Sequence, residues 1–174
     1  MAASSDAGPL IWLGKCDTLH LLRKLYTEIV IPEAVYEEAV SRGLEKGFED
    51  AQIIKKALEE EWIKVYKTSK KFTDKVESVE KRLDIELGVG EREAVALALE
   101  KEIIIFLTND EDAYQVGTRL SLEPKGVLYV LLKGVKEGWL NKKQAKESLG
   151  EMLEEGFWLS PIIIHKFHEA LARP

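Results

Sequence analysis

The stretch IIIFLTNDED, residues 103–112, decides the fold of this 174-residue chain. Its five consecutive apolar residues, 103–107, predict a buried β-strand, and the Asn and Asp residues that follow are typical of the start of a helix. A second β-branched run, residues 29–31, ends at Pro32, which suits the first turn of a helix. Buried strands that lead directly into helices are characteristic of a parallel α/β sheet covered on both faces.

Outward from these two strands, the chain alternates between strand and helix patterns. Further strands are expected at residues 2–6, at 62–66 and within 157–164, where a terminal helix broken by Pro161 also starts. Helices are expected at residues 9–13, 18–26, 32–41, 48–61, 72–87, from 91 onward, and at 112–120, 125–136 and 142–154. Gly14 and Asp17 are interpreted as breaker and cap, and Gly88 and Gly90 as breakers before Glu91. We predict one α/β domain, residues 1–174, with a parallel sheet of four or five strands and with the last ~20 residues as a packed C-terminal extension.

The composition is that of an ordinary soluble globule, with 45% hydrophobic and 32% charged residues. No apolar run approaches the roughly 20 residues that span a bilayer, and the N-terminus lacks a secretory signal pattern. Cys16 is the only cysteine, so we expect a reducing cytoplasm. The net charge of −6 argues against a basic nucleic-acid coat but allows an enzyme that binds phosphate through metal ions. Few Asn and Gln beside many Glu and Lys favour a heat-adapted source.

Four acidic residues each stand where a strand gives way to a helix or where a helix begins: Asp6, Glu38, Glu91 and Asp110. A doubly wound sheet gathers such positions in one crevice beyond the carboxyl ends of its strands. Neighbouring carboxylates repel one another unless a hard divalent cation neutralises them. The pattern therefore indicates a metal-dependent phosphodiesterase.

Each of these acids also has an ordinary structural interpretation. Asp110 suits the N-cap of a helix as well as a metal site. Glu91 falls within an apolar helical stripe, where a carboxylate is costly unless paired, or it lies in solvent as a capping residue. Glu37 and Glu38 flank their buried helix face equally, so periodicity does not choose between them, and a solvated Glu is the commoner case.

Four segments in order resemble the motifs of PIN-domain proteins, the VapC-like ribonucleases. The segments are SDAGPLI at 5–11, IPEAVYEE at 31–38, GEREAVALA at 90–98 and LTNDEDA at 107–113. The second motif selects Glu38 over Glu37, and the third is similar to a branch that carries Gly-Glu. GVL at 126–128 and GFWLSP at 156–161 also resemble that branch. Tyr114 and Asn109 depart from it, standing where Arg and Asp are frequent.

The resemblance implies a three-layer α/β/α sandwich, an acidic pocket for Mg²⁺ or Mn²⁺, and endonucleolytic cleavage of RNA. In many relatives it also implies a homodimer and a toxin opposed by an antitoxin protein. We expect Asp6 and Asp110 to be direct metal ligands and Glu91 a ligand directly or through water. Glu38 is expected as a water-mediated ligand or as the base that orients water. The residues expected to contact substrate are Thr108, Asp112, Lys70 and Lys71.

Two other functions compete with this interpretation. An aspartyl-phosphate phosphatase needs an Asp-x-Asp arrangement after its first strand, yet Ala7 and Gly8 follow Asp6. A PIN-like module that holds RNA or a protein without cutting would have no reason to retain four mutually repelling acids. The lysines around residues 64–75 form either an RNA contact or, more commonly for such a run, a solvated helix end.

Overall fold

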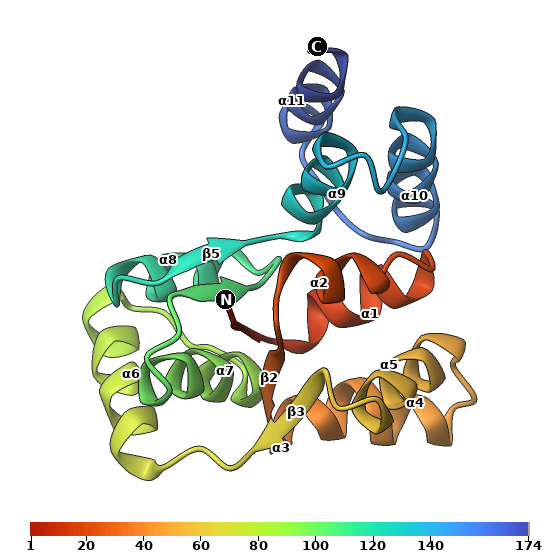
Figure 1. Ribbon diagram of the computed structural model, residues 1–174. Helices are drawn as coiled ribbons and strands as arrows, with labels where there is room; N and C mark the ends of the chain where they lie inside the picture. Colours follow the sequence, from red (N-terminus) through yellow and green to blue (C-terminus); the bar gives the residue numbers. More distant parts are fainter. Residues whose placement is uncertain (174) are drawn as a thin grey trace.

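The computed structural model describes residues 1–173 and has a five-stranded, fully parallel sheet at its centre (Figure 1). The strand order is β3-β2-β1-β4-β5, and each neighbouring pair is parallel. The strands are β1 Ala3–Ser5, β2 Ile29–Pro32, β3 Ile63–Tyr66, β4 Ile105–Leu107 and β5 Glu123–Lys125. The α/β class and the parallel sheet predicted from the sequence are confirmed.

Helices cover both faces of this sheet. They are α1 Ala7–Lys15, α2 His20–Leu25, α3 Glu33–Tyr36, the π-helical turn η1 Glu37–Ser41, α4 Arg42–Glu45, α5 Glu49–Glu59, α6 Lys70–Leu83, α7 Val89–Glu100, α8 Glu111–Arg119, α9 Val127–Lys136, α10 Lys142–Glu154 and α11 Pro161–Ala172. Helix α7 packs on β1, β2 and β4 with α6 and α8 beside it, whereas α1, α2 and α9 pack together in the other layer. Helices α9, α10 and α11 form a group at the C-terminal end of the chain (Figure 1). The expected three-layer sandwich is therefore present.

The sheet reverses its winding between β1 and β4. The chain passes from β1 to β2 on one side and later returns to place β4 on the other side of β1. The backbone N–H of Asp6 donates to the Leu107 carbonyl oxygen at 3.1 Å, which joins the ends of these two strands. Parallel α/β sheets bind their ligands in the crevice beyond such a switch point.

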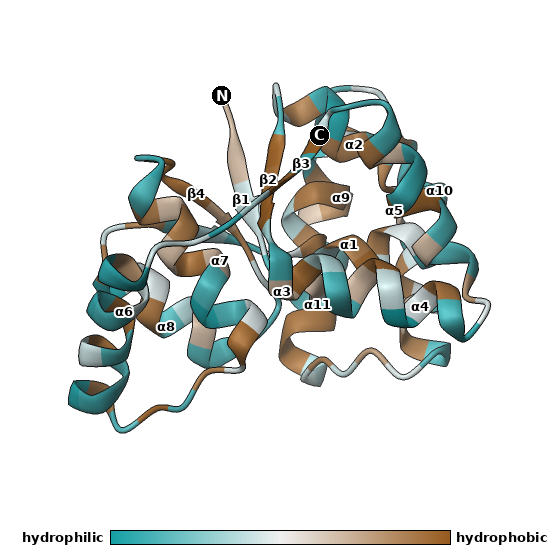
Figure 2. Ribbon diagram, turned by 90° about the horizontal axis from the view of Figure 1, so that it is seen from below, coloured by the Kyte–Doolittle hydropathy of each residue, from teal (hydrophilic) through white to brown (hydrophobic). Residues whose placement is uncertain are grey.

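Strand β1 is polar but completely buried. Ser4 and Ser5 are both 0% exposed. The Ser4 hydroxyl donates to the Ala94 carbonyl oxygen of α7 at 2.8 Å, and the Ser5 hydroxyl donates to the Asp6 carbonyl oxygen at 2.8 Å. Because both buried hydroxyls are satisfied, a central strand of small polar residues is tolerated and α7 lies directly against it. Strands β2 and β4 carry apolar core residues, visible as their brown ribbons (Figure 2).

The last strand lies elsewhere than predicted. Residues 157–164 contain no strand, and Pro161 begins α11 instead of breaking it, with the Ser160 hydroxyl accepting from the Ile163 N–H. The fifth strand is β5, whose three residues Glu-Pro-Lys carry no apolar alternation. An edge strand pairs through its backbone on one side only, so its side chains need not follow a buried pattern.

The predictions for two glycines and for two helix boundaries are also wrong. Gly14 lies inside α1 and Gly90 inside α7, which begins at Val89 and not at Glu91. A Cβ atom on Gly14 would stand 3.0 Å from the Asp50 Cβ, so this glycine permits close packing of α1 on α5. Helix α6 ends at Leu83, not at residue 87, because Asp84 takes a left-handed backbone conformation with φ of 54°. Within residues 1–173, no helix combines the length and the apolar character that a bilayer crossing requires.

Two separate glycine-to-alanine substitutions test the close packing of α4 against α5. A Cβ atom on Gly43 of α4 would stand 2.6 Å from the Ala51 Cβ of α5, whereas one on Gly150 of α10 would meet nothing within 4 Å. We predict that Gly43→Ala destabilises the fold by about 1–3 kcal/mol through overpacking. Gly150→Ala should stabilise it by about 0.5–1 kcal/mol. Equal melting temperatures for the two variants in thermal denaturation would contradict this packing.

Candidate active site

All four acids singled out from the sequence line one cavity of about 240 Å³ at the switch point. We call this cavity the acidic pocket. Its wall consists of Asp6, Ala7, Gly8, Glu38, Gly88, Val89, Gly90, Glu91, Asn109 and Asp110. No Lys, Arg or His is among these described residues, so the protein supplies no positive side chain to the pocket wall.

Asp6 is the most deeply placed of the four carboxylates. It follows β1 directly, is 4% exposed, and caps α1 by accepting from the Gly8 N–H at 3.1 Å. Burial raises the pKa of Asp6 to about 8; Glu91 and Asp110 add to the rise, and the Thr108 hydroxyl and the Gly8 N–H oppose it. A positive charge close to this carboxyl group would favour its ionised form near neutral pH.

Asp110 both caps a helix and faces the pocket. Its Oδ1 accepts from the Ala113 N–H at 2.8 Å at the start of α8. The Asp110 N–H donates to the Thr108 hydroxyl at 3.1 Å, which fixes the turn after β4. The two interpretations considered from the sequence are thus compatible, because capping occupies only one carboxylate oxygen.

Glu91 likewise combines its two sequence interpretations. It is half-buried in the first turn of α7, and its Oε2 accepts from the Gly88 N–H at 2.8 Å. Burial raises the pKa of Glu91, and the nearby carboxylates of Asp110, Glu38 and Asp112 raise it further. Glu91 is therefore a helix-capping residue that also belongs electrostatically to the acidic pocket.

Glu38 reaches the rim of the pocket from the π-helical turn. Its side chain is exposed, and its Oε2 would stand 3.2 Å from a Cβ atom on Gly90. Between the two glutamates that periodicity left open, Glu38 lines the pocket and Glu37 does not. A π-helical turn is rare and occurs frequently at functional sites, since it redirects side chains within a helix.

Four helices point their N-termini toward this region. The N-cap residues of α1, α7 and α8 are Asp6, Gly88 and Asp110, and all three line the pocket. Helix α9 begins beside it, where the Val127 N–H donates to the Asn109 Oδ1 at 2.9 Å. Helix N-termini carry partial positive charge and stabilise nearby anions by about 0.3–1 kcal/mol each. They offset part of the repulsion among the carboxylates and favour a phosphate group at the same place.

The donor set fits a hard, hydrated cation better than a closed cage. Within residues 1–173, no three His, Cys, Asp or Glu side chains stand close enough together to form a ready-made metal cage. The capping bonds of Asp6, Glu91 and Asp110 each occupy one oxygen and hold the carboxylates around an open space. Mg²⁺ takes only one or two carboxylates and retains several waters, whereas structural zinc needs a closed Cys and His set. The residues present therefore fit Mg²⁺ or Mn²⁺.

Residues 3–173 match a family model described as a PIN domain. The chain belongs to the PIN-domain family. Among curated proteins, none is significantly similar to it in sequence. PIN domains are in general nucleases, so family membership supports a nuclease-type function. It also confirms, at the level of the family, the resemblance found in the sequence motifs.

The four residues expected to contact substrate differ in how near they lie to the acidic pocket. Thr108 is buried between Asp6 and Asp110, and Asp112 is exposed but close enough to raise the pKa of Glu91. Lys70 and Lys71 lie at the start of α6, where the preceding Ser69 N–H donates to Glu100 at the far end of α7. That end is about 18 Å from the pocket end of α7, at 1.5 Å per residue.

Asn109 is a site residue for which the sequence analysis predicts no role. Its Oδ1 accepts from α9, while its Nδ2 is buried beside Gly8 with no hydrogen-bond partner in the described chain. A Cβ atom on Gly126 would stand 2.9 Å from the Asn109 Oδ1, so only glycine leaves room for this contact. The sequence does contain a signal for it, because Asn109, Asp110 and Asp112 cluster after β4 although a helix N-cap needs only one such residue.

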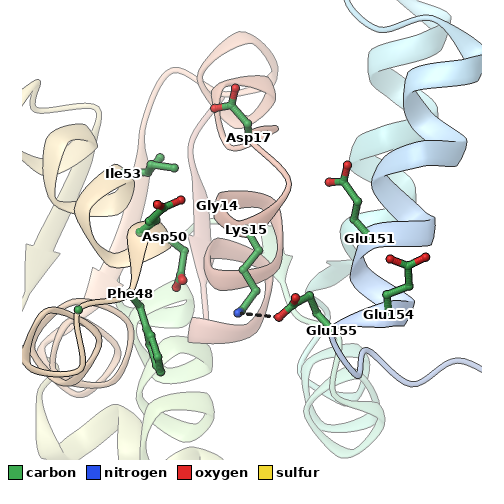
Figure 3. Close-up of a pocket in the computed structure, with 11 residues that line it drawn as sticks. Gly14, Lys15, Asp17, Phe48, Asp50, Ile53, Glu151, Glu154 and Glu155 are labelled. Atoms are coloured by element: carbon green, nitrogen blue, oxygen red, sulfur yellow. Dashed lines mark ion pairs between the residues drawn. The ribbon is translucent and has the colours of Figure 1, made fainter.

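A larger cavity, of about 640 Å³, lies away from the strand ends between α1, α5 and α10 (Figure 3). Its acids include Asp17, Asp50, Glu151 and Glu154, and Lys15 pairs across it with Glu155 at 3.6 Å. These side chains come from helices and their connections, and none follows a strand of the sheet. The cavity therefore lacks the switch-point position that favours the acidic pocket as the active site.

The pKa of Asp6 predicts a pH-dependent stability for the metal-free protein. Between its ordinary value of 3.8 and about 8, the folded state keeps a proton that the unfolded state has lost. The Asp6 contribution therefore makes the fold less stable as pH rises through this window. We predict that Asp6→Asn, which retains the cap on α1, melts at the wild-type temperature near the low end of the window. Near its high end the variant should melt higher by more than about 2–4 °C, the shift that 1 kcal/mol gives in a domain of this size.

The exposed Asp84→Asn variant is the matched control for thermal melts in EDTA. It should follow the wild-type profile throughout. A constant difference between Asp6→Asn and wild type at every pH would show that Asp6 ionises as freely in the folded chain as in the unfolded one.

Proposed function

We propose that this PIN domain is a metal-dependent endoribonuclease that hydrolyses RNA phosphodiester bonds at the acidic pocket. The observation that carries the proposal is the gathering of four carboxylates and the N-termini of α1, α7 and α8 at one switch-point cavity without a basic side chain. The general nuclease activity follows from the family. The preference for RNA is supported by the resemblance of the four motifs to the VapC-like ribonucleases.

Asp6 and Asp110 would hold Mg²⁺ or Mn²⁺ directly, and Glu91 would hold it directly or through water. When bound, the ion acidifies a water molecule and neutralises charge on the phosphoryl oxygens. Thr108 positions the ligand set. Its hydroxyl accepts from the Asp110 N–H, and its interaction with the Asp6 carboxylate lowers the pKa of Asp6.

The other pocket residues would bind and orient the reactants. Glu38 is exposed at the rim, so its carboxylate can orient the attacking water and accept its proton. The helix N-termini around the pocket favour the negatively charged phosphate. Lys70 and Lys71 do not line this pocket, and their contact with a distant part of the RNA stays a prediction, as does a contact by Asp112.

We also propose that the protein acts as a homodimer and as the toxin of a toxin–antitoxin pair. The resemblance to VapC-like proteins supports both ideas. The exposed apolar side chains of Trp158 and Ile162, which are 82% and 67% exposed, favour a protein contact near α11.

Substitution of Asp110 tests the proposed activity. Asp110→Asn keeps an N-cap for α8, so its melting temperature should stay close to that of the wild type. Its Mn²⁺-dependent cleavage of single-stranded RNA should fall by more than about 100-fold, since even groups outside the ligand set are worth about 10–100-fold. The measurement is the initial rate on a labelled oligonucleotide, with Asp84→Asn as the control that retains full activity.

Full activity in Asp110→Asn would remove Asp110 from the catalytic set. A wild-type protein that binds RNA but cleaves none with Mg²⁺ or Mn²⁺ would instead identify the chain as a binding module.

A further inference from the structure

A second hollow adjoins the acidic pocket, and its walls are mainly apolar. We call it the apolar cleft; its volume is about 310 Å³. The side chains that give it its character are Tyr114, Val127, Tyr129, Phe157, Leu159 and Ile163. They come from α8, from α9, from the segment that leads into α11, and, for Ile163, from α11 itself.

The two hollows share a wall. Asn109 and Asp110 line both of them, so the two hollows are adjacent. Asn109 stands at the boundary, with its Oδ1 bonded to the Val127 N–H on one side and its Nδ2 beside Gly8 on the other. A group next to a phosphate bound in the acidic pocket would therefore be beside the apolar cleft.

Three aromatic side chains line the cleft. Phe157 packs against Trp12 with ring centroids 5.0 Å apart. The Lys125 Nζ lies 5.1 Å from the centroid of the Tyr129 ring and also pairs with Glu123. Tyr114, by contrast, is 51% exposed, so its ring is accessible to a ligand at the mouth of the cleft.

We propose that the apolar cleft binds one unstacked nucleobase next to the scissile phosphate of a single-stranded nucleic acid, with Tyr114 as the stacking side chain. The inference rests on the proposed nuclease function and specifies its substrate. A base can reach the cleft only after leaving a duplex stack, so the substrate strand is single. Stacking on an aromatic ring is tolerant of base identity, because every base presents a π-face. The cleft selects single strands and contributes little sequence preference.

A second copy of this chain is the competing occupant, because α11 exposes apolar side chains near the cleft. Continuity with the acidic pocket favours the base, because Asn109 and Asp110 line both hollows.

The test measures binding at low salt with Ca²⁺ in place of Mg²⁺ or Mn²⁺, because a hard cation neutralises the carboxylates of the acidic pocket. The RNA is checked for cleavage at the end of each titration. Fluorescence anisotropy compares a labelled single-stranded RNA with oligonucleotides that each carry one abasic residue. We expect Tyr114→Ala to weaken binding about 5- to 150-fold, the range of stacking on one aromatic side chain. Tyr114→Phe should retain binding. Phe48→Ala is the matched control, because Phe48 is a half-exposed aromatic residue in the other cavity.

The abasic series supplies the decisive comparison. One abasic position should weaken wild-type binding by the same factor as Tyr114→Ala and should not weaken binding of Tyr114→Ala further. Equal binding by wild type and Tyr114→Ala overturns the proposal, even if the protein cleaves RNA. Loss of a dimer in Tyr114→Ala with unchanged binding also overturns it and assigns the cleft to a second copy. Binding that depends on Tyr114 without any cleavage with Mn²⁺ supports the base site while the nuclease proposal fails.

Discussion

Repulsion among carboxylates gathered at the ends of β1 and β4 is the constraint on which the rest of this structure depends. Asp6 is almost fully buried there, and Glu91 and Asp110 are close enough to raise its pKa further. Such an arrangement costs stability unless other groups compensate. The N-termini of α1, α7 and α8 provide part of the compensation through capping bonds and partial positive charge. A divalent cation in the acidic pocket would provide the remainder, and phosphate chemistry would follow from its presence.

The fold brings about this gathering through close approaches of backbone to side chains of other segments. Small side chains in β1 let α7 lie against the centre of the sheet, held by the bond from Ser4 to Ala94. Gly90 then lets the start of α7 approach Glu38, and Gly126 lets the start of α9 approach Asn109. Each of these contacts joins segments that are distant in the sequence. The pocket is therefore a property of the packed domain, and no single motif forms it alone.

The fold class and the position of Asp110 could be predicted from local patterns, whereas Glu38 was selected only through the family resemblance. A buried run followed by Asn-Asp at residues 103–110 indicates a strand that enters a helix, and parallel strands place such junctions at one edge. Strand β5 was missed because an edge strand of Glu-Pro-Lys has no periodic signal. Gly14 and Gly90 were misread as breakers because their close contacts are tertiary. The convergence of the helix N-termini and the bond from Val127 to Asn109 depend on the same long-range packing.

Anomalous diffraction from crystals soaked in Mn²⁺ tests the central claim most directly, because it locates the ion independently of activity. The account predicts one strong anomalous peak in the acidic pocket, coordinated by Asp6 and Asp110. An empty acidic pocket would contradict it. So would a peak confined to the cavity between α1, α5 and α10, where Asp50, Glu151 and Glu154 offer carboxylates without the switch-point geometry.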